Sequence, residues 1–241
     1  MKYEELLPHQ IEEMLEQAPV AYIPWGALEW HGRHLVIGND AIKAAAICER
    51  VADRTGGVVL PPVYFGNRTM KRKGFRHTLE IREATVRAMA YDLLRGLESE
   101  GFKVVVILTG HYGSRHLAAL KGVGEKFGKG KEIRVWTLAE YEVVTDLGYT
   151  GDHAAKWETS ILMHLRPDLV DMEQLSTDPD EPLEGVHGDD PRKHASPEVG
   201  REIVEAIVER MAKRVKELMN NEQHSANRLD AGLLTKIGGQ N

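Results

Sequence analysis

The chain has 241 residues, a net charge of -6 and a single cysteine, and these properties exclude several classes of protein. A chain of this length can bury a full hydrophobic core, and we expect residues 1–241 to form one domain. The negative charge gives it no reason to bind nucleic acid or an anionic membrane. With Cys48 as its only cysteine, it forms no internal disulfide and no cysteine-based metal site. It lacks a signal-peptide pattern and any apolar run near the ~20 residues that span a bilayer, so we expect a soluble, cytoplasmic protein.

Short apolar segments alternate with amphipathic segments along most of the chain. In chain order, the predicted elements are a helix ending near residue 17, a strand at 20–24, a helix at 41–53, a strand at 58–60, a helix at 83–100, a strand at 103–108, a helix at 114–127, a strand at 133–138, a helix at 152–165, a surface loop at 178–197 and a helix at 197–219. The strand at 103–108 is apolar enough to be covered on both faces. This alternation predicts the α/β class, in the form of a three-layer α/β/α sandwich with a mainly parallel central sheet.

Polar side chains gather in three clusters that follow predicted strands. The clusters occupy residues 25–40, 109–114 and 151–159. In a parallel sheet, ligand and catalytic sites lie beyond the carboxyl ends of the strands. We therefore expect the three clusters to contribute to one site.

The clusters contain the residue types that bind divalent metal ions. Glutamate, histidine and aspartate suit Zn, Mn or Fe, and a carboxylate can bridge two ions. Glu29 and His31 are two residues apart, so on an extended segment their side chains point the same way. Asp40 is the natural bridging carboxylate, and His111 stands where a strand delivers a side chain to the crevice.

Each of these residues also has an ordinary structural explanation. Asp40 could cap the helix that follows it, and His31 or His111 could be a turn residue. Glu158, in the first turn of its predicted helix, could complement the helix dipole. Their joint occurrence after three strands favours a common metal site over four separate explanations.

Three of these segments resemble the motifs of the creatininase (creatinine amidohydrolase) family. The run from Gly26 to Asp40 resembles the family signature, which reads roughly Gly-Ser-x-Glu-x-His-Gly-Pro-His-Leu-Pro-x-Gly-x-Asp. The pair Gly110-His111 resembles the second histidine motif of the family. The segment 153–160 resembles its His-Ala-Gly-x-x-Glu-Thr-Ser motif. The resemblance covers residues 20–170, with the three motifs in the family's order.

The resemblance implies a three-layer α/β/α subunit with a dinuclear metal centre, assembled into a homo-oligomer, usually a hexamer. By position, Glu29 and His111 would bind one ion, His31 the other, and Asp40 both. His153 would be the acid–base histidine near the leaving group. Members of the family open cyclic amides, remove formyl groups from formamides, trim peptide ends or hydrolyse sugar lactones.

The chain departs from the family pattern at a few positions. Creatininase itself has a glutamate ligand two residues after the second histidine, where this chain has Gly113. This difference argues against creatinine as the substrate. It leaves Glu158 as the best carboxylate for the second ion, and the other possibility is that Glu158 is an acid–base group. Arg33 replaces the signature proline, and His77 replaces a glycine.

The pattern therefore predicts a metal-dependent amidohydrolase that acts on a small molecule. Two divalent ions (Zn, Mn or Fe) would lower the pKa of a bound water from about 15.7 to about 7, which supplies hydroxide at neutral pH. This hydroxide would hydrolyse the C–N bond of a cyclic amide or a formamide. The first alternative is a metal-dependent lactonase or related enzyme that acts on a sugar or polyol derivative. The second is a binding or assembly protein with one structural metal.

Further residues are candidates for contact with the substrate. Asn67, Tyr112 and Trp157 could line the pocket, although each could equally be a turn or core residue. The segment 68–77 is strongly basic in an acidic protein. It could be a solvated loop, or a lid that attracts a carboxylated, phosphorylated or polyhydroxylated substrate.

Overall fold

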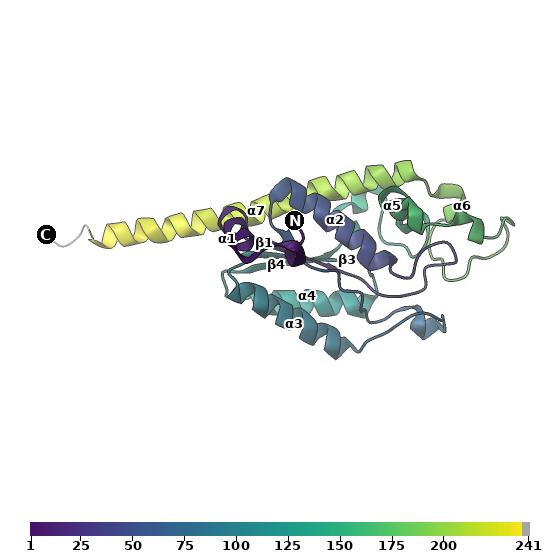
Figure 1. Ribbon diagram of the computed structural model, residues 1–241, viewed down its shortest axis with the longest axis horizontal. Helices are drawn as coiled ribbons and strands as arrows, with labels where there is room; N and C mark the ends of the chain where they lie inside the picture. Colours follow the sequence, from purple (N-terminus) through teal and green to yellow (C-terminus); the bar gives the residue numbers. More distant parts are fainter. Residues whose placement is uncertain (238–241) are drawn as a thin grey trace.

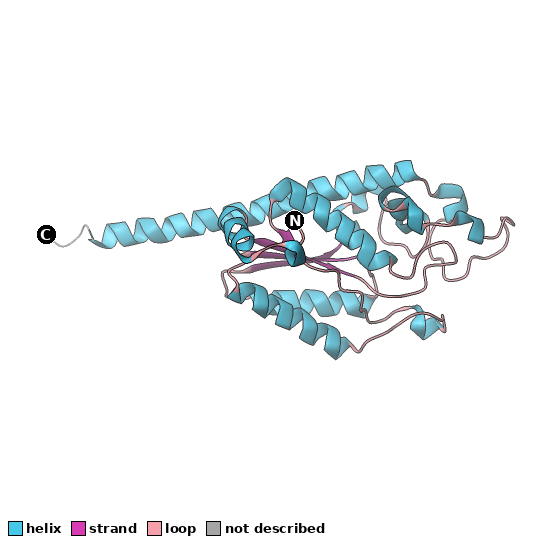
Figure 2. Ribbon diagram, in the orientation of Figure 1, coloured by secondary structure: helices cyan, strands magenta, loops and turns pink. Residues whose placement is uncertain are grey.

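A sheet of four parallel strands forms the centre of the protein (Figure 2). The computed structural model describes the backbone of residues 1–237 and the side chains of residues 1–220. The strands are β1 (Val20–Trp25), β2 (Val58–Val59), β3 (Val104–Thr109) and β4 (Arg134–Ala139), in the order β2-β1-β3-β4. Each predicted strand is present, with bounds within one residue of the prediction. Helices connect consecutive strands, as parallel pairing requires.

Helices cover both faces of the sheet and form the two outer layers. One layer contains α2 (Asn39–Thr55), α5 (Lys156–Leu165) and α7 (Pro197–Ile237), and the other contains α3 (Glu83–Ser99) and α4 (Ser114–Gly128). Figure 1 shows α2 and α7 on one side of the strands and α3 and α4 on the other. The N-terminal α1 (Pro8–Gln17) adds Met14 to the core beneath α3. The predicted three-layer sandwich is confirmed.

The alternation of side chains along the central strands produces two separate cores. Tyr22 and Val106 face the layer that contains α2 and α7, whereas Ile23 and Ile107 face α3 and α4. All four are fully buried, and burial of one large apolar side chain contributes about 1.5–3 kcal/mol. Strands β1 and β3 are therefore fixed from both sides, and the loops that follow them start from a rigid base.

Two predicted helix bounds were wrong. Helix α5 begins at Lys156 rather than residue 152, because the Asp152 carboxylate accepts hydrogen bonds from the N–H groups of Trp157 (2.7 Å) and Glu158 (3.2 Å) and thus stands outside the helix. Helix α7 continues to Ile237 instead of ending at residue 219. The sequence after residue 219 is mainly polar, with an apolar pair at Leu233 and Leu234, and these two residues lie outside the side chains that the structure describes.

Short helices complete the chain. They are η1 (Tyr3–Glu5), η2 (Met70–Lys73), η3 (Glu140–Val143), η4 (Thr145–Leu147), η5 (Pro167–Leu169), η6 (Met172–Gln174) and α6 (Pro191–His194). The basic segment thus contains η2, and the predicted surface loop contains α6, whose first turn is capped by the Asp190 side chain. Within the described residues, every helix is too short or too polar to cross a membrane.

Candidate metal centre

The candidate site lies where the strand order of the sheet reverses direction. The chain places β2 on one side of β1 and β3 on the other, so a crevice opens beyond the carboxyl ends of β1 and β3. Glu29 and His31 lie on the loop after β1, and His111 follows β3. Asp40 and Glu158 lie in the first turns of α2 and α5. The five residues predicted as ligands therefore come together from four parts of the fold.

Two glycines allow Asp40 to reach the ends of both central strands. A Cβ atom on Gly26 would lie 2.2 Å from the backbone nitrogen of Ala41, and a Cβ atom on Gly110 would lie 2.2 Å from the carbonyl oxygen of Asp40. Any side chain at either position would push the start of α2 away from the sheet. The bare glycines instead seat this turn against both strands, where Asp40 is fully enclosed.

Glu29, Asp40 and His111 form a first group of candidate ligands. Glu29 Oε1 lies 2.7 Å from His111 Nδ1, and Asp40 Oδ2 lies 3.3 Å from the same nitrogen. One ligand atom from each of the three buried residues lies within 4.8 Å of the other two. Two carboxylates and an imidazole that converge in this way are a donor set for Zn, Mn or Fe.

His31, Asp40 and Glu158 form a second group, which shares Asp40 with the first. His31 Nε2 lies 2.8 Å from Asp40 Oδ1 and 3.5 Å from Glu158 Oε2. Asp40 thus presents Oδ1 to one histidine and Oδ2 to the other. This arrangement suits a carboxylate that bridges two ions.

Backbone carbonyl groups fix the orientation of both histidine rings. A carbonyl oxygen can only accept, so His31 donates from Nδ1 to the carbonyl of Glu29 (3.0 Å) and keeps its lone pair on Nε2. His111 donates from Nε2 to the carbonyl of Asn67 (2.9 Å) and keeps its lone pair on Nδ1. The free nitrogens are the two that face Asp40. Such partners hold a histidine in the tautomer that binds a metal.

The buried ligand atoms lack hydrogen bonds of their own. Among the described side chains, His31 Nε2 and both carboxylate oxygens of Asp40 are buried without a hydrogen-bond partner. The 2.8 Å contact between Nε2 and Oδ1 is an ion pair only when His31 is protonated. An unpaired buried polar group costs about 1–3 kcal/mol. Divalent ions would satisfy these atoms, so the residues present fit a metal centre.

The cluster also changes the proton affinity of its histidines. Burial lowers the pKa of His31, but the adjacent Asp40 and Glu158 carboxylates outweigh burial and raise it to about 9. Burial lowers the pKa of His153, and the nearby His31 lowers it further. Without metal, His31 is therefore protonated at neutral pH and balances the carboxylates, whereas His153 is neutral. A bound ion takes the place of the His31 proton.

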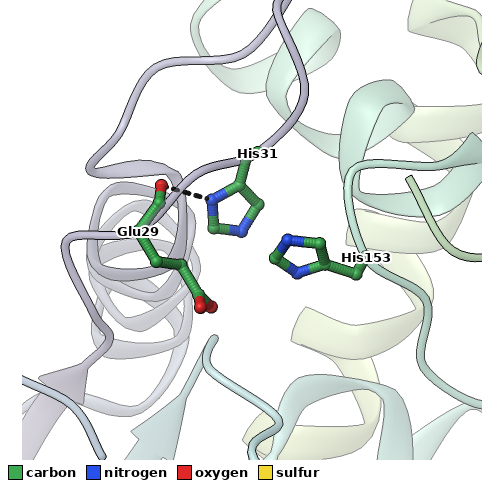
Figure 3. Close-up of side chains that lie close together, drawn as sticks. All are labelled: Glu29, His31 and His153. Carbon is green, nitrogen blue, oxygen red and sulfur yellow. Dashed lines mark hydrogen bonds between the residues drawn. The ribbon is translucent and has the colours of Figure 1, made fainter. Parts of the chain in front are cut away.

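His153 lies beside His31, on the side of the cluster that faces the cavity described below. The two rings have centroids 4.3 Å apart, and Figure 3 shows Glu29, His31 and His153 pointing toward a common centre. His153 donates from Nε2 to the carbonyl of Trp30 at 2.8 Å, so its lone pair is on Nδ1. The structure thus places His153 where an acid–base group can serve the same site.

A buried lysine that the sequence analysis missed holds Glu158. Lys43 is fully buried and donates hydrogen bonds to Glu158 Oε1 and to the Tyr112 hydroxyl (2.7 Å), while Glu140 Oε1 lies 3.0 Å from its Nζ. Burial lowers the pKa of Lys43, but Glu140 and Glu158 outweigh burial and raise it. The sequence contained a signal: Lys43 lies three residues after Asp40, on the apolar face of the predicted helix.

A cavity of about 480 Å³ opens onto the cluster. Its lining includes six predicted site residues: Glu29, Asp40, His111, Tyr112, His153 and Glu158. The basic segment also contributes to the lining, with Arg68, Thr69, Met70, Arg72 and Lys73. The volume suits a small molecule.

Two predicted substrate-contact residues do not line this cavity. The side chain of Asn67 donates to the carbonyl of Ile81 (3.0 Å), and its backbone carbonyl holds His111. Trp157 stacks on Tyr149 with ring centroids 5.2 Å apart. Tyr112 does line the cavity, although its hydroxyl group is bonded to Lys43 and Glu140.

An α/β sandwich with a buried carboxylate–histidine cluster open to a small cavity has the architecture of a metal-dependent hydrolase. The family model "Creatininase: Creatinine amidohydrolase" matches residues 4–215. The chain therefore belongs to the creatininase family and is a hydrolase, as the sequence motifs implied.

Relatives with described activities share modest sequence identity with the chain. A creatinine amidohydrolase of Pseudomonas putida is 28% identical over 232 residues, which cover 82% of this chain and 89% of the relative. A 3-dehydro-scyllo-inosose hydrolase of Thermotoga maritima is 28% identical over 102 residues, which cover 42% of this chain and 33% of the relative. A mycofactocin precursor peptide peptidase of Mycolicibacterium smegmatis is 28% identical over 170 residues, which cover 68% and 64% of the two chains.

Solved structures confirm the fold. A crystal structure of creatinine amidohydrolase (creatininase) superposes with a TM-score of 0.76 at 25% identity, covering 89% of this chain and 96% of that chain. A structure described as "Creatininase Mn" has a TM-score of 0.74 at 27% identity, with 89% and 97% coverage. A mutant creatininase of "Zn-Zn type" also has a TM-score of 0.74 at 27% identity, with 89% and 96% coverage.

Proposed function

We propose that this protein is a metal-dependent amidohydrolase that hydrolyses the C–N bond of a small cyclic amide or formamide, with two divalent ions (Zn, Mn or Fe) per subunit. The observation that carries the proposal is the pair of ligand groups that share Asp40 at the base of the cavity. The Zn and Mn forms of the structural relatives support this choice of ions.

The ligand roles follow from the two groups. Glu29 and His111 would hold one ion, His31 and Glu158 would hold the other, and Asp40, which belongs to both groups, would bind to both. When bound, the ions supply Lewis acidity, which lowers the pKa of water and stabilises negative charge on a carbonyl oxygen. Met70 keeps Glu29 in place by donating its backbone N–H to Glu29 Oε2 at 2.8 Å.

His153 moves the proton that the reaction requires. Its neutral ring accepts a proton at Nδ1, because Nε2 is fixed as a donor to the carbonyl of Trp30. It then delivers this proton to the leaving nitrogen. The carboxylate of Glu158 is held in place by hydrogen bonds that it accepts from Lys43 and from the N–H of Ala154 (2.7 Å). We therefore assign Glu158 to metal binding rather than to proton transfer.

The remaining predicted contacts receive more specific roles. Tyr112 contacts the substrate from the wall of the cavity, whereas Asn67 acts by orienting His111, and Trp157 supports the wall through Tyr149. From the family resemblance we also propose a homo-hexamer. A cytoplasmic location agrees with the buried free thiol of Cys48.

A substrate comparison after metal exchange tests the function. The chelated protein should lose activity and regain it with Zn or Mn, and activity that is insensitive to chelation would contradict the metal mechanism. Formamides, cyclic amides and sugar lactones should be assayed side by side, because the partial match to an inosose hydrolase keeps a lactonase, or a related enzyme that acts on a sugar or polyol derivative, as the second candidate. Turnover of lactones with no turnover of amides would favour that candidate.

A further inference from the structure

The cavity contains a cation that has no partner. Of the basic residues that line it, Arg72 pairs with Glu80 at 2.9 Å and Lys73 bonds to His187 at 2.6 Å. Arg68 lines the same cavity, yet within residues 1–220 it makes no hydrogen bond or ion pair, and its buried Nε is unsatisfied. A guanidinium group carries five donors in a fork that matches carboxylate and phosphate groups.

The backbone holds Arg68 in place on both sides. The preceding Asn67 accepts a hydrogen bond from His111, and the following Thr69 donates its N–H to Glu80 at 2.9 Å. Arg68 itself has a positive φ of 64°, which an ordinary side chain rarely adopts. Backbone strain of this kind is retained mainly at functional sites.

Gly113 gives Arg68 the room to enter the cavity. A Cβ atom on Gly113 would lie 2.7 Å from His111 Nε2, 2.9 Å from the carbonyl oxygen of Asn67 and 3.0 Å from Arg68 Cβ, so a side chain there would crowd the segment that carries Arg68. Gly113 is also the position at which creatininase has a glutamate. In this chain, the cavity wall thus lacks a carboxylate at Gly113 and has a cation at Arg68.

The acidic residues of the site do not neutralise Arg68. Glu29 and Asp40 face the histidines, and Glu158 is bonded to Lys43. The first turn of α4, at Gly113 and Ser114, also lines the cavity and has no side-chain cap, so its positive dipole end adds to the charge of Arg68. An anion in the cavity would complement both.

We propose that Arg68 is a specificity-determining residue that binds an oxyanion of the substrate, either a carboxylate or a phosphate. The inference rests on the proposed function: the bound molecule is a small amide that carries this anionic group beside the scissile bond. Lys73, tied to His187 at the mouth of the cavity, contributes a second positive charge. The proposal narrows the substrate from any amide to an anionic amide.

The test compares Arg68→Gln, Arg68→Lys and the control Lys71→Gln, which removes an exposed charge from the same segment outside the cavity lining. In the metal-loaded proteins, binding of inorganic phosphate and of acetate is measured by calorimetry. Hydrolysis is then compared for matched formamides that are neutral, carboxylated or phosphorylated. Arg68→Gln should weaken anion binding and lower kcat/KM for the charged formamides by roughly 10- to 100-fold, leaving the neutral formamide unaffected. The anion whose binding weakens more in Arg68→Gln, phosphate or acetate, shows whether the substrate carries a phosphate or a carboxylate.

Arg68→Lys should recover part of the loss, because it restores the charge but not the fork. Lys71→Gln should match the wild type. Unchanged anion binding and an unchanged preference for charged formamides in Arg68→Gln would overturn the proposal, even if the melting temperature falls. If no amide is hydrolysed by the wild type but phosphate binding still weakens in Arg68→Gln, the anion site stands and the proposed amide hydrolysis fails.

Discussion

The substitution Lys43→Met tests whether the buried lysine neutralises the carboxylates behind the metal centre. Methionine keeps most of the apolar part of the lysine side chain but removes the ammonium group from between Glu140 and Glu158. Removal of one partner from a buried ion pair costs about 3–5 kcal/mol. Glu158 retains the Ala154 N–H, and Glu140 retains the Tyr112 hydroxyl. We therefore expect the lower end of this range, about 3 kcal/mol.

Urea unfolding of the chelated and the metal-loaded protein measures this loss. With a slope of about 3 kcal/mol per molar urea, the midpoint of the chelated variant should fall by roughly 1 M. The loss should be smaller with metal, because an ion bound to Glu158 neutralises one of the two carboxylates. The double variant Lys43→Met/Glu140→Gln should recover at least half of the loss, since it leaves no unpaired charge at Glu140.

The control is Lys213→Met, which changes an exposed lysine of α7 and should alter the unfolding free energy by less than about 0.5 kcal/mol. If Lys43→Met lowers the unfolding free energy as little as this control does, the ammonium group does not balance the two carboxylates and the reasoning fails. If the double variant is less stable than the single variant, the loss comes from packing rather than from charge.

Other substitutions test the remaining parts of the site. Asp40→Ala should release both ions, and metal analysis that still finds two per subunit would contradict the bridging role. Glu158→Gln should release one ion and keep the other; two retained ions with near-normal activity would return Glu158 to the role of a helix-dipole residue. Gly113→Ala should destabilise the protein by about 1–3 kcal/mol, because its Cβ would lie 2.7 Å from His111 Nε2, and an unchanged melting temperature would contradict this packing. Light scattering at micromolar concentration should give the mass of a hexamer, and a monomeric mass would refute the proposed assembly.

The strands were predictable because their apolar runs are buried on both faces and bounded by glycine or proline. The start of α5 was not, since periodicity cannot show that the Asp152 side chain satisfies N–H groups that a further helical turn would have satisfied. The end of α7 was missed for a different reason. The helix was predicted to end at residue 219, where the sequence becomes polar, but polar residues such as Asn, Gln and Glu are compatible with a helix.

The candidate ligands were predictable because motif spacing and strand ends both selected them. The residues that hold these ligands in place were not predictable. Lys43 and Glu140 are 97 positions apart in sequence number and meet only because the start of α2 and the start of η3, which follows β4, come together beyond the carboxyl end of the sheet. Likewise, Asn67 was predicted as either a pocket residue or a turn residue, and the sequence did not show that its backbone carbonyl accepts a hydrogen bond from His111. Contacts of this kind depend on packing between distant elements, which no local pattern records.

Lys43 and Gly113 together restrict which protein atoms each proposed ion can bind. Glu158 Oε1 accepts a hydrogen bond from Lys43 and Oε2 accepts one from the N–H of Ala154, and Oε2 is the oxygen that faces His31. Gly113 offers no ligand to either group. Each group therefore contains three protein ligands, the number typical of catalytic rather than structural zinc sites, which leave a position open for water or substrate. The cavity that opens onto these groups has Arg68 in its lining. The departure from creatininase at Gly113 thus removes a carboxylate from the cavity, and Arg68 adds a positive charge to its wall.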